Sequence, residues 1–172
     1  VATIRALKMH GGASDYTVEN LEALEAGFAN LSKHIENVQK YHVPYVVAIN
    51  RFASDTEAEI KLLYDWALAN NHTVTLSEVF AKGAEGGVDL ANKVVETIEK
   101  YDGYNTYEKL YDYNERIETK IETIAKEIYG ADGVDYTDAA LAQLADFYRL
   151  GYDKMPICMA KTPNSLTDDA KV

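Results

Sequence analysis

The pattern of apolar and polar positions over residues 1–102 predicts three strands, each followed by a loop and a helix. Five consecutive apolar residues at 45–49 fit a strand that is covered on both faces, because a strand with one exposed face would alternate apolar and polar residues. Residues 1–7 and 72–80 are the other two strand candidates, and the second of them is rich in β-branched residues. Alternating strands and helices are typical of a parallel sheet with flanking helices, so we expect an α/β fold.

The helices of this part are predicted by apolar stripes with spacings of three and four. The longest stripe lies within about 17–40 and indicates an amphipathic helix. A second helix is expected at about 56–69, where Ser54 and Glu57 have the spacing of a capping box. The third, at about 88–100, is expected to bury four apolar residues: Ala91, Val94, Val95 and Ile98.

A second, smaller and helix-rich α/β unit is expected where the character of the chain changes. Apolar stripes predict a long helix at about 106–129 and a shorter one at about 137–150, capped by Thr137. The apolar run 155–160 predicts a strand with Cys158 buried inside it. We therefore expect two domains, at 1–102 and 103–172.

Three loops of the first domain are candidates for a shared binding site. Crossover connections between parallel strands are right-handed and return the chain to the same starting edge of the sheet. The loops at 8–16, 50–55 and 77–87 should therefore lie at one edge. Open α/β sheets bind their ligands at the carboxyl ends of the strands, so function is expected at this edge.

The loop after the central strand holds the residues with the clearest chemical interest. Asn50 and Asp55 could bind a purine base, as side chains after a buried strand do in many P-loop nucleotide-binding proteins, but both residue types also begin turns and cap helices. Phe52 is an aromatic residue in a polar loop with no evident core to fill. A planar ligand stacked on its ring would explain its presence.

Composition and motifs argue against several classes of protein. The formal net charge of −11 disfavours nucleic acid or an anionic membrane surface as the main partner. A single cysteine provides no disulfide framework, and the four histidines lack the spacing of a metal site, so no metal ligands are expected. No Gly-Lys-Ser or Gly-Lys-Thr sequence is present, which excludes a Walker loop in this chain.

The sequence also leads to expectations about where the protein is located and whether it is part of a longer chain. The chain has no apolar run that approaches the roughly 18 residues of a membrane span, and it opens with no signal peptide. With one cysteine, a reducing cytoplasm is the default location. The chain begins within a strand candidate and without an initiator Met, so we expect an interior piece of a longer protein.

Several segments resemble the formate–tetrahydrofolate ligases, which are ATP-dependent 10-formyltetrahydrofolate synthetases. The first segment reads Val-Ala-Thr-Ile-Arg-Ala-Leu-Lys-Met-His-Gly-Gly, and a twelve-residue match of this kind is highly specific. The resemblance covers essentially the whole chain. It continues through four further segments, at 46–52, 77–83, 128–134 and 158–162.

The resemblance implies a reaction in two stages. Formate attacks the γ-phosphate of MgATP to give formyl phosphate, and N10 of tetrahydrofolate then takes the formyl group. Such chemistry needs charge neutralisation and alignment more than a side-chain nucleophile, and no catalytic residue is expected in this chain. The family's phosphate loop lies upstream of this segment, so the segment alone should be inactive. The family also implies a homotetramer, and it allows for a monovalent cation.

The resemblance also assigns roles to individual residues. Phe52 aligns with an aromatic residue that packs on the folate ring system, and Phe80 aligns with its stacking partner, which is usually Trp in the family. Ala53 and Leu76 match positions near the adenine pocket, and Asn50 is the nucleotide-binding candidate at the end of the central strand. A further departure is an alanine at position 84, where the family typically has glycine.

A second interpretation comes from a different class of protein. The residues alone are also compatible with a non-catalytic α/β binding or scaffold module whose loops contact a partner protein. A ligase would carry a glycine-rich phosphate loop upstream of this segment, whereas a module would end near these borders.

Overall fold

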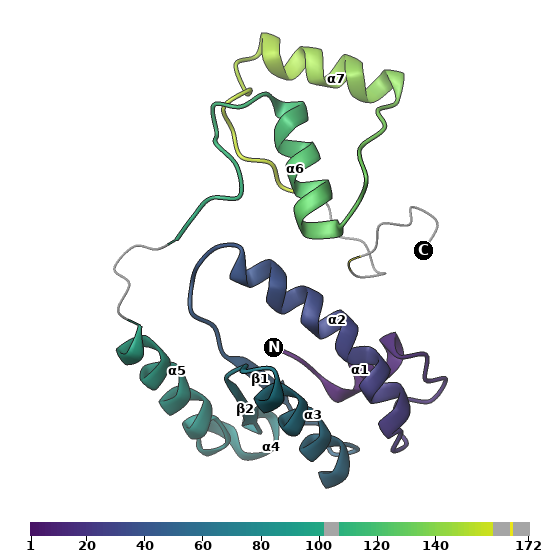
Figure 1. The fold of residues 1–172 in the computed structure, drawn as a ribbon, viewed down its shortest axis with the longest axis vertical. Coiled ribbons are helices and arrows are strands. Elements are labelled where there is room, and N and C mark those ends of the chain that lie inside the picture. Colours follow the sequence, from purple (N-terminus) through teal and green to yellow (C-terminus); the bar gives the residue numbers. More distant parts are fainter. Residues whose placement is uncertain (102–106, 160–165, 167–172) are drawn as a thin grey trace. The chain divides into compact units, whose positions relative to one another are not determined.

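The structure, a computed structural model, describes residues 1–101, 107–159 and 166 (Figure 1). The chain divides into two compact units, Val1–Thr106 and Tyr107–Val172. The first unit contains the sheet, and the described elements of the second are two helices joined by irregular segments.

The sheet of the first unit is small and parallel. Strand β1 (Val47–Asn50) pairs with β2 (Val74–Ser77), with Val47 opposite Val74 and Asn50 opposite Ser77. Figure 1 shows helices packed around the two strands. Their bounds are α2 (Leu21–Gln39), α3 (Glu57–Ala69) and α5 (Val88–Lys100). The prediction of an α/β fold with a parallel sheet is confirmed.

The predicted first strand at 1–7 is largely wrong. Only Ala2 joins the sheet, where it forms a parallel bridge with Ile49. The chain then enters helix α1 (Ile4–His10), capped by the Thr3 hydroxyl, which accepts a hydrogen bond from the Ala6 amide at 3.2 Å. The apolar residues Ile4 and Leu7 are both buried and lie three positions apart, which places them on one face of a helix.

The core of the first unit lies between the sheet and helices α1, α2 and α3. Each large apolar side chain that is fully buried contributes roughly 1.5–3 kcal/mol to stability. The residues of α3 that the apolar spacing places on its inward face, Ile60, Leu63 and Ala67, are all buried. The core consists of Ala2, Ile4, Leu7, Leu24, Phe28, Leu31, Ile35, Val47, Ile49, Ile60, Leu63, Ala67 and Val74.

Helices α1 and α2 are in backbone contact through two glycines. A Cβ atom on Gly27 of α2 would lie 2.0 Å from the carbonyl oxygen of Leu7, and one on Gly11 would lie 1.7 Å from the carbonyl oxygen of Ala23. Both distances are far below a van der Waals contact. Glycine at these positions therefore allows α1 to lie directly against α2.

Helix α3 begins with a capping box two residues later than predicted. The Thr56 hydroxyl accepts from the Glu59 amide at 3.2 Å, and the Glu59 carboxylate accepts from the Thr56 amide at 3.1 Å. Ser54 and Glu57 do not form the predicted box, because residues 51–55 form a separate turn and the backbone first becomes helical at Glu57.

Helix α5 forms as predicted, but its apolar stripe is exposed. Ala91, Val94, Val95 and Ile98 were all expected to be buried, whereas Ile98 is 63% exposed and the others are exposed as well. Periodicity identifies an apolar face but not the element that covers it. No element in the described part of the chain covers this stripe.

The second unit contains helices α6 (Ile117–Tyr129) and α7 (Asp138–Arg149). The helix predicted at about 106–129 is shorter than expected, because the Asp112 carboxylate accepts from the Asn114 amide at 2.9 Å and holds a turn. Thr137 caps α7 as predicted, with its hydroxyl accepting from the Ala140 amide at 3.2 Å.

The segment after α7 is irregular, and the strand predicted at 155–160 is not present at 155–159. Residue 160 lies outside the described residues. The segment is held by polar contacts: the buried Lys120 amine donates to the carbonyl oxygens of Asp153 and Met155, at 2.6 and 3.2 Å. Cys158 is exposed and not buried as predicted, because no sheet encloses it.

Candidate functional site

The carboxyl edge of the sheet brings together the loops that the sequence placed there. The loops after β1 and β2 are neighbours, because the strands are parallel and the Arg51 amide donates to the Ser77 carbonyl at 3.0 Å. The first segment reaches this edge by a different route from the one predicted. The chain leaves the sheet after Ala2, so the start of α1 lies beside the loop after β1.

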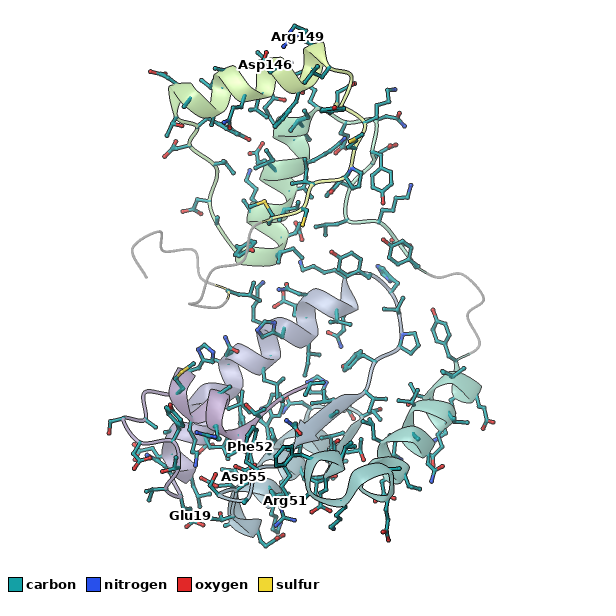
Figure 2. The ribbon with its side chains drawn as sticks, turned by 180° about the vertical axis from the view of Figure 1, so that it is seen from behind. Glu19, Arg51, Phe52, Asp55, Asp146 and Arg149 are labelled. Carbon is teal, nitrogen blue, oxygen red and sulfur yellow. The ribbon has the colours of Figure 1, made fainter. Side chains whose placement is uncertain are left out.

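The loop after β1 is shaped by Asp55. Its carboxylate accepts from the Phe52 amide at 2.8 Å, and its own amide donates to the Phe52 carbonyl at 3.0 Å. Asp55 is 5% exposed, and its Oδ1 atom has no hydrogen-bond partner in the described structure. Burial raises the pKa of this carboxyl group, although the bond from the Phe52 amide acts in the opposite direction. Figure 2 shows Arg51, Phe52 and Asp55 together on this loop.

Phe52 forms one wall of a surface pocket of about 240 Å³. Its side chain is 37% exposed. The guanidinium carbon of Arg5 lies 5.1 Å from the centroid of the Phe52 ring and 5.1 Å from that of Tyr16. The pocket is lined by Thr3, Arg5, Ala6, Met9, Tyr16 and Phe52. It therefore combines two aromatic walls with one positive charge.

The loop after β2 presents Phe80 to solvent. Phe80 is 94% exposed and lies in the short helix α4 (Val79–Lys82), which is followed by the 3₁₀ turn η1 (Gly83–Gly87). The loop closes on itself, because the Glu78 amide donates to the Gly86 carbonyl at 2.9 Å. A Cβ atom on Gly86 would lie 2.4 Å from the Glu78 carbonyl oxygen, so glycine is needed there.

An ion pair connects the two loops. The Arg51 guanidinium contacts the Glu78 carboxylate at 3.3 Å and also pairs with Glu57 at the start of α3. The Lys82 amine contacts the other oxygen of Glu78 at 2.6 Å. The hydrogen bond from Lys82 is the main reason that the pKa of Glu78 is lowered. Arg51 and Glu78 thus fix the spacing between the loops that carry Phe52 and Phe80.

Behind the loop after β1 lies a fully buried ion pair. The Lys8 amine contacts the Glu59 carboxylate at 2.7 Å and also donates to the Val18 carbonyl at 2.9 Å. Burial alone would raise the pKa of Glu59, but hydrogen bonds from Lys8, Thr56 and Asn20 lower it overall. The pair connects helix α3 with helix α1 and with the segment before α2. It therefore stabilises the elements on which the loop after β1 rests.

A separate cavity in the first unit does not include the loops after β1 and β2. It has a volume of about 420 Å³ and is lined by α1, α2 and the residues at the start of β1. His10 and His34 lie on its wall, and burial, followed by the nearby charge of His10, lowers the pKa of His34. None of the residues predicted to bind a ligand lines this cavity.

The residues predicted to bind a nucleotide lie at or near the same edge. Asn50 and Leu76 are partly buried at the ends of the strands, and Ala53 is exposed on the loop after β1. Leu76 also packs against the core. Their role in binding adenine, and the stacking of folate between Phe52 and Phe80, stay predictions.

Sequence reasoning missed the residues that support this site. Arg5 falls within the strand predicted at 1–7, and Lys8 and Tyr16 fall within the loop predicted at 8–16, with no contact assigned to any of the three. The partners Lys8 and Glu59 are 51 positions apart, and no local pattern joins them. The one feature of the sequence that could have indicated a buried lysine is its position, since Lys8 directly follows the apolar residues Ile4 and Leu7 of the same helix.

No group of three or more His, Cys, Asp or Glu side chains in the described part of the chain is arranged to hold a metal ion. None of its helices combines the length and the apolar character that a membrane span requires.

The fold and the site define the class of protein. The first unit is a parallel α/β unit with aromatic and charged residues in the loops at the carboxyl edge of its strands, which is the edge at which open α/β sheets bind ligands. The family model of formate–tetrahydrofolate ligase matches residues 1–172, and the chain belongs to this family. The substrates of the family are formate, ATP and tetrahydrofolate, so the chain is related to one-carbon metabolism.

Proposed function

We propose that this chain supplies the folate-binding loops and part of the adenine pocket of an ATP-dependent formate–tetrahydrofolate ligase. The observation that carries the proposal is the position of two exposed aromatic rings. Phe52 and Phe80 lie on neighbouring loops at the edge where α/β sheets bind ligands. Neither ring belongs to the buried core, so both are available to a planar heterocycle.

The proposed reaction joins formate to tetrahydrofolate in two steps. A carboxylate oxygen of formate attacks the γ-phosphorus of ATP, ADP leaves, and formyl phosphate forms. N10 of tetrahydrofolate then attacks the formyl carbon, loses a proton, and displaces phosphate to give 10-formyltetrahydrofolate. In this scheme the residues of this chain bind and orient the substrates. The adenine contacts fall to Asn50, Ala53 and Leu76.

The rest of the proposal concerns the longer protein. We propose that this chain is part of a P-loop nucleotide-binding ligase whose phosphate loop lies upstream, so that the segment alone is inactive. ATP would bind there with Mg²⁺, which neutralises phosphate charge when bound. A homotetramer in the cytoplasm is the proposed form of the enzyme.

A substitution of Phe52 tests the proposal in the full-length gene product. Phe52→Ala should weaken tetrahydrofolate binding by about 1–3 kcal/mol, because truncation of a stacked aromatic side chain costs this much in a binding site. The measurement is the Kd for tetrahydrofolate. The matched control is Phe147→Ala on α7, which truncates a ring that is similarly exposed, at 42%.

Phe80 provides the complementary test. Phe80→Trp should keep or strengthen tetrahydrofolate binding, because indole adds stacking area and an N–H donor, whereas Phe80→Ala should weaken it. An unchanged Kd in both Phe52→Ala and Phe80→Ala would favour the non-catalytic module instead.

A further inference from the structure

Arg5 differs from every other arginine of the chain. Arg51, Arg116 and Arg149 each form an ion pair with a carboxylate. Within the described residues, the side chain of Arg5 makes no hydrogen bond and no ion pair, and its guanidinium group contacts the rings of Tyr16 and Phe52. This is notable in a chain with 28 acidic residues and a net charge of −11.

The two rings hold the guanidinium group of Arg5 in position but leave its N–H donors without hydrogen-bond acceptors among the described residues. A guanidinium group has five N–H donors, which lie in its plane. Contact with an aromatic ring uses the face of the group and leaves these donors directed outward. The side chain of Arg5 is partly buried in the pocket beside Phe52, so it is held in place before any ligand arrives. The arrangement is a preorganised site for an oxyanion.

The pocket walls indicate the kind of molecule that carries this oxyanion. Besides Arg5, the pocket presents the apolar side chains of Met9 and Ala6 and the rings of Tyr16 and Phe52. An aromatic acid fits such a surface, with its ring against the apolar wall and its carboxylate on the guanidinium. Tetrahydrofolate has this chemistry, since its aminobenzoyl ring is followed by a glutamate.

We propose that Arg5 binds a carboxylate of the glutamate of tetrahydrofolate, while Tyr16 and Phe52 hold the guanidinium in position. The inference rests on the proposed function, because it uses the same Phe52 site. It adds that the anionic end of the substrate is recognised here, on the α1 side of the Phe52 ring. A guanidinium group also binds phosphoryl groups. The experiment below distinguishes a phosphoryl group from the glutamate carboxylate.

The first measurement compares two ligands on the unmodified full-length protein. Tetrahydropteroate lacks the glutamate but keeps the pteridine and benzoyl rings. It should bind roughly 10- to 100-fold more weakly than tetrahydrofolate, which is the usual effect of losing a charged hydrogen-bonded pair. Equal affinity for the two ligands would overturn the inference but leave the proposed function intact. If neither ligand binds, the proposed function itself is wrong.

The second measurement uses Arg5→Gln, with Arg149→Gln as a control that also removes one positive charge. Arg5→Gln should weaken tetrahydrofolate binding roughly 10- to 100-fold and leave the Kd for tetrahydropteroate within about twofold. Arg149→Gln should change neither. An equal loss for both ligands would assign Arg5 a structural role, and a loss confined to ATP would assign it to a phosphoryl group. Either result would overturn the inference. If Arg5→Gln does not fold, the comparison of tetrahydrofolate with tetrahydropteroate on the unmodified protein still tests whether the glutamate is recognised.

Discussion

At the scale of single residues, the buried pair of Lys8 and Glu59 has the largest expected effect on stability. Both side chains are inaccessible to solvent. Lys8→Met should destabilise the chain by about 3–5 kcal/mol, because it leaves the Glu59 carboxylate buried without its counter-charge. Urea unfolding, followed by the fluorescence of Trp66, measures the change. Lys61→Met is the control, since it removes a lysine from an exposed pair with Asp65 and should cost at most about 1 kcal/mol.

The same pair has a defined pH dependence. The pKa of Glu59 is lowered below its ordinary value of 4.5, so the stability it contributes is present above that value and is lost as the pH falls through the lower, folded-state pKa. The difference between the unmodified chain and Lys8→Met should therefore be largest near neutral pH and should narrow below pH 4.5. A constant difference down to low pH would contradict this account of the pair.

Single residues also show where sequence reasoning about the site reaches its limit. Phe52 could be identified because an aromatic residue in a polar loop conflicts with its local surroundings. Arg5 could not, because its importance depends on Tyr16 and Phe52, which lie 11 and 47 positions further along the chain. Asp55 was identified as a residue that could bind a purine base or begin a turn, but the burial of its carboxylate was not predicted. Contacts between distant residues have no signal in a local pattern.

At the scale of elements, the crossing of α1 and α2 depends on the absence of a side chain. Gly27→Ala should destabilise the chain by about 1–3 kcal/mol, because its Cβ atom would collide with the Leu7 carbonyl and force the helices apart. Urea unfolding measures the loss. Gly133→Ala is the matched control: a Cβ atom there would meet nothing within 4 Å, and the variant should be as stable as the original.

Helices with a regular apolar periodicity could be predicted from the sequence. Features that depend on contact with another element could not. Helices α2, α3 and α7 were predicted because their apolar residues recur on one face. The strand predicted at 1–7 became a helix after Ala2, since a short apolar run fits either structure. The apolar stripe of α5 was found correctly, but its burial was not, because burial depends on another element. The early part of the helix predicted at 106–129 was replaced by a turn at Asp112.

At the scale of the whole molecule, the two units differ in how they are stabilised. The first has a continuous apolar core around the sheet. Within the described residues, the buried apolar side chains of the second unit are few, and polar contacts supplement them. The buried apolar residues are Ile117, Ile124 and Leu144. Because the second unit buries little apolar surface, its free energy of unfolding should be lower than that of the first unit.

Hydrogen exchange tests this difference between the units. Amides of α6 and α7 should exchange sooner than those of β1 and α3, because regions with little apolar burial open at a lower free energy. The control is the frayed end of each helix, which should exchange quickly in both units. Equal protection of α6 and α3 would show that the polar contacts of the second unit stabilise it as much as the core stabilises the first.

One buried amine has a consequence for the chemistry of the molecule in solution. Lys120 is enclosed, and its amine donates two hydrogen bonds, to the Asp153 and Met155 carbonyls. A reagent or enzyme that acylates lysines can reach this amine only after residues 153–155 have come away from α6. Acylation would then remove the charge and two of the contacts, so that the segment could not return. A brief local opening would thereby be converted into a permanent covalent change.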